Sequence, residues 1–92
     1  MANLSLVDRS GALTGSSQSV LTTNPDRKGW RLMNTGNADL WFNDTGGAAS
    51  VGGAGCYKLV AGAYFETAPN LFPIPAVAVI GTAAQTFSAS EW

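Results

Sequence analysis

The residue types that perform nucleophilic catalysis are scarce in this chain. It has 92 residues, with a single cysteine and no histidine. A serine or cysteine nucleophile is normally activated by an adjacent base, often histidine. Cys56 therefore lacks an imidazole partner, and no motif supports a serine paired with Lys58. We interpret Cys56 as a small apolar filler in or near a strand, and we predict no catalytic residue and no enzymatic activity.

Carboxylates are the next groups that could do chemistry. Glycoside hydrolysis needs a pair of them, but the six acidic residues are spread along the chain and no pair stands out. Asp39, Asn43 and Asp44 crowd oxygen ligands of the kind that calcium prefers into one short segment. Because this segment has no calcium-loop signature, a hydrogen-bonded turn is favoured. We predict no metal site and no cofactor.

The Gly-rich stretch at residues 52–58 has some likeness to a phosphate-binding loop. Lys58 does not directly follow a glycine, and Leu59 follows it, so the motif is not matched. The stretch also precedes a predicted strand, whereas a phosphate-binding loop precedes a helix. We interpret residues 44–55 as a long connection that buries little except Val51 and becomes ordered by contact with a partner.

Charge is scarce in this composition. Charged residues make up 12% of the chain, against about 25% in an ordinary soluble domain. A small domain normally uses charge to stay soluble and monomeric, and oligomerisation is one way to stabilise a small core. We therefore expect much of this surface to be covered by other protein, including copies of the same chain.

The basic residues argue against nucleic acid as a partner. The chain has five Lys and Arg in total, and Arg27, Lys28 and Arg31 alone do not make a basic patch. We interpret Arg27 and Lys28 as a solvated turn before a strand.

Membrane and secretion signals are not evident. No run approaches the roughly 20 apolar residues of a membrane span, so we predict no membrane partner. The first residues lack the basic and apolar regions of a signal peptide. We expect the chain to begin near Met1 and to fold in a cytosol, where a lone cysteine is common.

Short alternating runs between turn residues predict strands along the whole chain. We predict an all-β fold: a small antiparallel β-sandwich or barrel, jelly-roll-like, of about seven or eight short strands. Residues 1–26 would form an N-terminal arm or the first strands, and residues 27–92 the sandwich or barrel domain. The candidate strands are residues 4–7, 20–23, 29–34, 38–43, 57–61, 64–67, 76–80 and 84–88.

Two turns are predicted to close hairpins. Residues 35–37 would join strands 29–34 and 38–43, because Gly36 and Asn37 tolerate the positive φ of tight turns. Gly62 would reverse the chain in the same way. In the strand before the first turn, alternation puts Trp30, Leu32 and Asn34 on one face and Arg31 and Met33 on the other. Tyr57, Leu59 and Ala61 would form the inner face of a later strand, and residues 76–80 a central buried strand.

Aromatic residues are the best candidates for binding. If Leu40 and Phe42 face the core, Trp41 points away from it, as a sugar-stacking platform or an interface anchor. The alternative for Trp41 is a core position under a covered second face. Trp92 is expected to dock on the domain or on a neighbour. The predicted interface residues are Trp41, Tyr64, Phe72 and Trp92.

The pattern of residues 27–92 resembles small structural proteins of tailed bacteriophages. The resemblance consists of Arg31-x-x-Asn34-x-Gly36, Leu40-x-Phe42, a Gly-rich loop, Leu59-x-Ala61-Gly62, the run 79–84 and the final Glu91-Trp92. Such proteins are short β-sandwiches or barrels that decorate or cement capsids, or occupy head-fibre and tail positions, often as trimers or other rings. The resemblance implies synthesis in a host cytoplasm, a place in the virion, and the major capsid protein or another virion protein as partner.

The expected function is therefore that of a phage virion structural protein, a capsid decoration or cement protein that assembles as a symmetric oligomer. The alternative is a carbohydrate-binding module, or a tail or fibre accessory domain, that stacks Trp41 or Trp30 on sugar.

Overall fold

The computed structural model describes residues 6–68 and 73–92, which form nine strands and no helix. The predicted all-β sandwich is confirmed, with nine strands in place of seven or eight. The strand that matches no candidate, β2, is two residues long, too short to show an alternating pattern. The strands are β1 (Val7–Asp8), β2 (Gly11–Ala12), β3 (Gln18–Leu21), β4 (Trp30–Asn34), β5 (Leu40–Asn43), β6 (Cys56–Leu59), β7 (Tyr64–Glu66), β8 (Val77–Gly81) and β9 (Thr86–Glu91).

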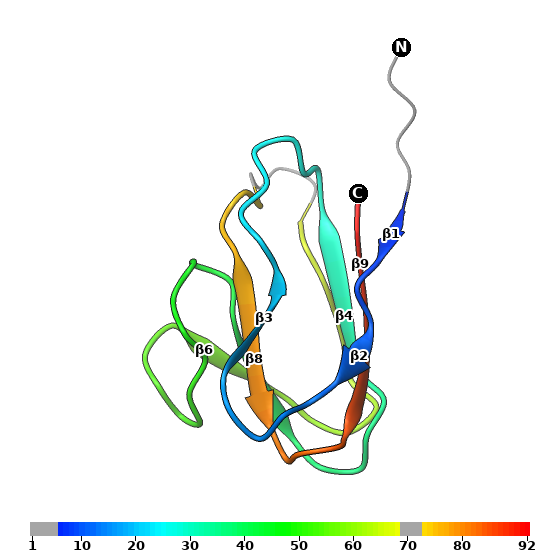
Figure 1. Ribbon diagram of the computed structural model, residues 1–92, viewed down its shortest axis with the longest axis vertical. Coiled ribbons are helices and arrows are strands. Elements are labelled where there is room, and N and C mark those ends of the chain that lie inside the picture. The colour runs from blue at the N-terminus through cyan, green and yellow to red at the C-terminus, as the bar shows by residue number, and fades with distance from the viewer. Residues whose placement is uncertain (1–5, 69–72) are drawn as a thin grey trace.

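The strands are arranged in two sheets that face each other (Figure 1). The five-stranded sheet has the order β9-β4-β7, with β1 and β2 both paired to the free side of β9. The four-stranded sheet has the order β3-β8-β5-β6. All of these pairs are antiparallel. The first 26 residues thus contribute one strand to the four-stranded sheet and two short strands to the other.

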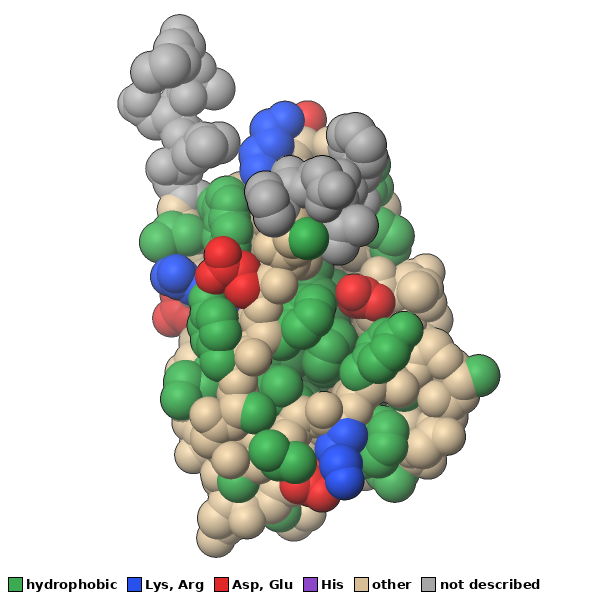
Figure 2. Space-filling model, turned by 180° about the vertical axis from the view of Figure 1, so that it is seen from behind, with side chains coloured by type: hydrophobic (Ala, Val, Ile, Leu, Met, Phe, Trp, Pro, Cys, Tyr) green, Lys and Arg blue, Asp and Glu red, His purple; other side chains and the backbone are tan. Residues whose placement is uncertain are grey.

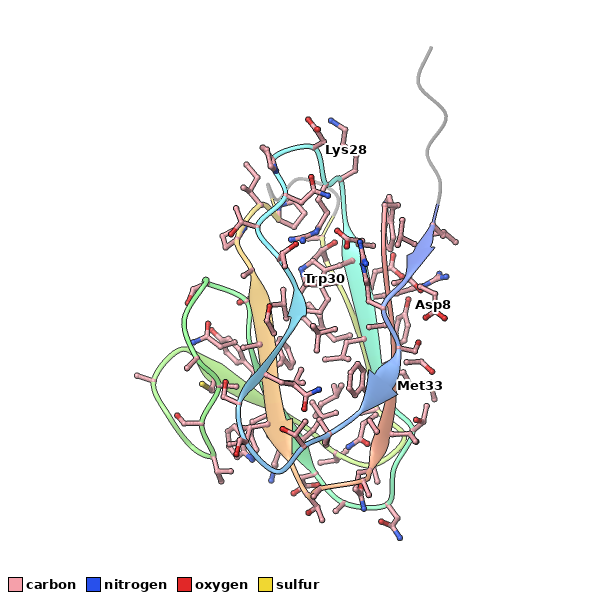
Figure 3. The ribbon with its side chains drawn as sticks, viewed as in Figure 1. Asp8, Lys28, Trp30 and Met33 are labelled. Atoms are coloured by element: carbon pink, nitrogen blue, oxygen red, sulfur yellow. The ribbon has the colours of Figure 1, made fainter. Side chains whose placement is uncertain are left out.

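The core lies between the sheets and follows the predicted alternation. In β4, Trp30, Leu32 and Asn34 are buried, whereas Arg31 is half-buried and Met33 is exposed. In Figure 3, Trp30 points between the sheets, and Asp8 and Met33 lie on the other side of the five-stranded sheet. The eleven buried side chains of the core cluster are Leu13, Leu21, Trp30, Leu32, Leu40, Phe42, Leu59, Val77, Val79, Phe87 and Ala89.

The run at residues 76–80 is confirmed as a central strand. It forms β8, which lies between β3 and β5, and its first three residues are buried although they alternate between two faces. Val77 and Val79 belong to the core cluster, while Ala78 is buried on the opposite face. A strand covered on both sides requires an apolar run without polar alternation.

The two predicted hairpins are wrong, because both turns are crossovers between the sheets. β4 and β7 pair with each other in one sheet, and β5 and β6 pair in the other. Residues 35–39 and 60–63 therefore carry the chain across the sandwich, whose layers pack about 10 Å apart. Gly and Asn allow the chain to turn, but the turn by itself does not decide whether the two strands that it joins pair with each other.

Other predictions are corrected by the same topology. Tyr57 is exposed because β6 is an edge strand, and Ala61 is exposed because it lies past the end of β6, in the crossover. Of the three predicted residues, Leu59 is the one buried in the core. Val51 is 69% exposed, and Ala49 is the buried residue of the long connection. The last strand, β9, begins at Thr86 and belongs to the five-stranded sheet. Of the first candidate strand, Val7 is in β1, and residues 4 and 5 lie outside the described residues.

Candidate interaction surface

One face of the five-stranded sheet combines exposed apolar side chains with few charges. We call it the outer face and define it by Leu6, Arg31, Met33, Tyr64, Glu66, Ser88, Ser90 and Trp92, which line two adjacent shallow depressions. Leu6 is 59% exposed and Tyr64 53% exposed. Arg31 borders both depressions and pairs in register with Ser90 and Glu66 on either side. A surface with this composition is typical of a protein contact.

Trp92 docks on the outer face of its own domain, which is one of the two predicted alternatives. Its backbone N–H donates to the carbonyl of Gly29 at 3.0 Å, and its carbonyl accepts from the N–H groups of Lys28 and Gly29. A Cβ on Gly29 would lie 2.5 Å from Cζ2 of Trp92, so the indole packs where a side chain is absent. The guanidinium of Arg31 lies over the indole, with Cζ 5.8 Å from the ring centroid, in cation–π geometry.

Tyr64 is fixed beside this tryptophan face by its neighbour on β7. Its hydroxyl donates to Oε1 of Glu66, two residues along the same side of the strand. The hydrogen bond to Glu66 raises the pKa of the Tyr64 hydroxyl above its ordinary value, because the carboxylate holds the proton on the phenol. The tyrosine is therefore neutral and presents an apolar ring with one polar tip.

A buried ion pair positions the C-terminal end of this face. Nε of Arg27 donates to Oε1 of Glu91 at 2.8 Å, and its two terminal nitrogens donate to the carbonyls of Thr22, Pro73 and Pro75. Arg27 is 3% exposed, so its interpretation as a solvated turn is wrong. All three nitrogens of the guanidinium thus have a hydrogen-bond partner in a carboxylate or a backbone carbonyl.

Glu91 gathers three partners from different segments. Arg27, Arg9 and Asn24 all donate to its carboxylate, Arg9 at 2.8 Å and Asn24 at 3.3 Å. Burial acts to raise the pKa of Glu91, but the hydrogen bonds from these three side chains outweigh it and the pKa lies below its ordinary value. The carboxylate is therefore charged at neutral pH and ties the chain end to the first 27 residues.

A second apolar surface opens between the edge strands β6 and β7. Here Phe42, Tyr57, Leu59 and Phe65 line a groove of about 380 Å³, with Asp44 and Lys58 at its rim. Phe42 packs against Phe65 at 5.0 Å and against Tyr57 at 5.9 Å between ring centroids. Figure 2 shows hydrophobic side chains gathered along the middle of this side of the molecule. We call this the aromatic groove.

Trp41 lies on neither of these surfaces. It is half-buried on the outside of the four-stranded sheet, where it pairs in register with Lys58 on one side and Ile80 on the other. Trp30, by contrast, is 2% exposed and packs against Phe42 and Phe65 in the core. Trp30 thus has no free face to stack on a ligand, and Trp41 is the tryptophan that remains for that role.

The long connection at residues 44–55 is anchored to the domain by hydrogen bonds to Asn43 and Ser17. The Asn43 amide donates to the carbonyl of Ala48 at 3.1 Å and its oxygen accepts from Thr45, while the N–H of Ala49 donates to Ser17 Oγ. Cys56 is half-buried and contacts Ser50, as expected for a small filler.

The polar residues first considered for calcium are separated by the sheet. Asp39 precedes β5 and Asp44 follows it, so they lie at opposite ends of that strand. Within residues 6–68 and 73–92 there is no group of three or more Cys, Asp or Glu that could hold a metal ion.

The structure brings together two of the four predicted interface residues. Tyr64 and Trp92 share the outer face, Trp41 lies on the opposite sheet, and Phe72 lies outside the described residues. Sequence reasoning did not single out Met33 as a surface candidate, although strand alternation already placed it opposite the core. It also missed Arg27 with Glu91, for which 63 intervening residues leave no local signal.

Comparisons with known proteins add no relative. No protein-family model, no curated protein and no solved structure matches the chain. Among the described residues, no helix is long and apolar enough to cross a membrane.

Proposed function

We propose that this protein is a structural component of a tailed-phage virion, a capsid decoration or cement protein that assembles as a symmetric oligomer. The sequence resemblance over residues 27–92 supports a place in the virion. The protein's mode of action is surface complementarity, in which one low-charge face binds copies of the chain and another binds the major capsid protein or another virion protein.

The outer face is the observation that carries the proposal. Leu6, Met33 and Tyr64 are exposed large apolar residues that lie with Trp92 on one sheet. Single exposed apolar side chains are ordinary on a monomer, but a group of them on one face marks an interaction site. Aromatic residues, Met and Arg are the types enriched in the centre of protein interfaces.

The energetics favour a repeated contact. Apolar burial contributes about 25 cal/mol per Å², and a standard interface buries about 1,600 Å² in total. Loss of translational and rotational freedom offsets much of this gain, so a single contact is modest. In a ring or on a shell the same contact recurs, and multivalency holds the assembly together.

Light scattering of the purified protein at several concentrations tests the assembly. We expect a trimer or larger ring whose mass is independent of concentration above the micromolar range. A monomer at the highest concentration reached would contradict self-assembly.

The virion location needs a separate measurement on particles. Virions purified from a source that carries this gene are separated on a density gradient and probed with an antibody against the protein. We expect the protein in the particle fraction, with antibody bound to intact particles. Its recovery solely from the soluble fraction would overturn the virion assignment.

The second candidate function is carbohydrate binding, favoured by Trp41. It is half-buried on the outside of the four-stranded sheet and is the cross-strand partner of Lys58, whose amino group can donate to sugar hydroxyls. Titration with a panel of oligosaccharides would quench tryptophan fluorescence in the native protein but not in Trp41→Phe. Unchanged fluorescence across the panel would contradict carbohydrate binding, and the structural role would be the one proposed function that remains.

A further inference from the structure

The N-terminal strands form a strap that pairs with β9 and inserts one side chain, Leu13, into the core. We define the strap as residues 6–13, which include β1, β2 and Leu13. Its register on β9 is fixed by four pairs, among them Asp8 opposite Ser90 and Gly11 opposite Phe87. Two further backbone bonds join Arg9 to Ala89 at 2.8 Å and Leu13 to Gln85 at 2.7 Å. Figure 1 shows the strap running beside β9 along the edge of the sheet.

The strap contributes little to its own core. Every side chain from residue 6 to residue 12 is exposed, and Leu13 alone is buried. The strap is held by ladder hydrogen bonds, by the Leu13 side chain and by the ion pair from Arg9 to Glu91. An exchanged strap would make the same ladder bonds and ion pair with β9 of a second copy, and Leu13 would enter the core of that copy beside its Gly81. Exchange between chains therefore conserves these contacts.

The site that the strap occupies remains well formed when the strap leaves. Glu91 keeps its hydrogen bonds from Arg27 and Asn24, so its charge stays compensated without Arg9. The vacated edge of β9 contains Thr, Phe, Ser and Ala before Glu91, and it has no Pro or Lys that would hinder pairing with another strand. An edge of this kind is a template for pairing with another strand.

The connection between strap and body has the properties of a hinge. Residues 14–17 read Thr-Gly-Ser-Ser and are all exposed, and Gly15 has a φ of +90°. The turn is closed by Thr14, whose N–H donates to Gln18 Oε1 and whose hydroxyl accepts from Ser16. The strap and β3 belong to opposite sheets, so opening this turn directs the strap away from its own β9.

We infer that the strap is exchanged between copies: the strap of one chain pairs with β9 of the next. The inference rests on the proposed self-assembly and names the segment that joins neighbours. Passed head to tail from chain to chain, it closes a ring, since each copy donates one strap and accepts one.

A disulfide across the exchanged ladder tests this inference. Asp8 and Ser90 are cross-strand partners, and such pairs have Cα atoms about 4.5–5.5 Å apart, within the range of a disulfide. The chain carries D8C and S90C together in a C56A background, assembles at neutral pH and is then oxidised. We expect covalent multimers on a non-reducing denaturing gel, of the same size as the native oligomer.

Controls and outcomes separate this inference from the proposed function. The two single variants in the C56A background should yield monomers on the same gel, because neither holds a complete pair. An oligomer by light scattering whose chains run as internally closed monomers on the gel overturns the exchange but leaves self-assembly standing. A protein that is monomeric by light scattering overturns both.

Discussion

The buried guanidinium of Arg27 is the residue on which the chain end most depends. Removing one partner of a buried pair costs about 3–5 kcal/mol, because the other charge is left uncompensated. In Arg27→Met, Glu91 keeps its hydrogen bonds from Arg9 and Asn24. The three carbonyls that accept from Arg27 lose their donor, so the free energy of unfolding should fall by an amount at the lower end of that range, about 3 kcal/mol. Urea denaturation followed by tryptophan fluorescence measures the change.

Two variants keep this prediction sharp. Arg27→Lys retains the charge but not the planar fork, and should lose less than the methionine variant. Lys28→Met removes an exposed neighbouring charge and should change stability by less than about 0.5 kcal/mol. Equal stability of Arg27→Met and Lys28→Met would show that the buried pair does not stabilise this fold.

The carboxylate of Glu91 should make stability depend on acid. Its folded pKa lies below the ordinary value, so its contribution is complete above the unfolded pKa of about 4.3 and is lost as pH falls through the folded pKa. The urea midpoint of the native protein should thus drop in that acid window. In Glu91→Gln this part of the drop should vanish, whereas Asp26→Asn, an exposed change, should retain it. Parallel acid profiles for the native protein and Glu91→Gln would contradict the prediction.

At the scale of elements, Trp92, which follows β9, packs against Gly29, which precedes β4 and has no side chain. A Cβ at Gly29 would lie 2.5 and 2.7 Å from two ring atoms of Trp92, distances that force the indole to move. Gly29→Ala should therefore displace Trp92 from the outer face and red-shift its emission, with a loss of about 1–3 kcal/mol. Gly11→Ala is the matched control, because its Cβ would meet Phe87 at an ordinary 3.5 Å. An unshifted emission spectrum for Gly29→Ala would refute this account of Trp92.

The two crossovers depend on one buried amide. Nδ2 of Asn34 donates to the carbonyls of Ala38 at 2.7 Å and Leu59 at 2.8 Å, and its oxygen accepts from Gly36. Asn34 is fully buried, so Asn34→Ala would leave these groups without a partner in the core. We expect a loss of about 2–4 kcal/mol by urea denaturation, against less than about 1 kcal/mol for the exposed Asn37→Ala. Equal losses would show that the amide does not hold the crossovers.

At the scale of the whole molecule, the outer face should decide association. Met33→Lys and Tyr64→Lys each place a charge that must be desolvated in the contact, and should weaken self-association on the order of tenfold or more. Val51→Lys adds the same charge to an exposed residue of the long connection and should leave association unchanged. Sedimentation velocity over a range of concentrations measures both. If all three variants associate like the native protein, the outer face is not the interface.

Much of the local structure could be predicted from the sequence alone. The alternation in residues 30–34 correctly placed Trp30 and Asn34 inside and Met33 outside, and the apolar run at residues 76–80 correctly predicted a central strand. Both signals are local, because side chains on a strand alternate with a period of two wherever the strand is placed. The all-β class follows from the same short runs and turns.

Which strands pair, and which residues share a face, was decided by the tertiary structure. The turns at residues 35–39 and 60–63 have hairpin composition, yet they cross between sheets: β4 pairs with β7 and β9, while β5 pairs with β6 and β8. The sequence around Arg27 is typical of a solvated turn, but in the folded chain the distant Glu91 and the carbonyls near residue 74 enclose its guanidinium. Strand pairing also places Tyr64 and Trp92 on the outer face of the five-stranded sheet and Trp41 on the four-stranded sheet. Such contacts join residues far apart in the chain, and a local pattern is compatible with several pairings.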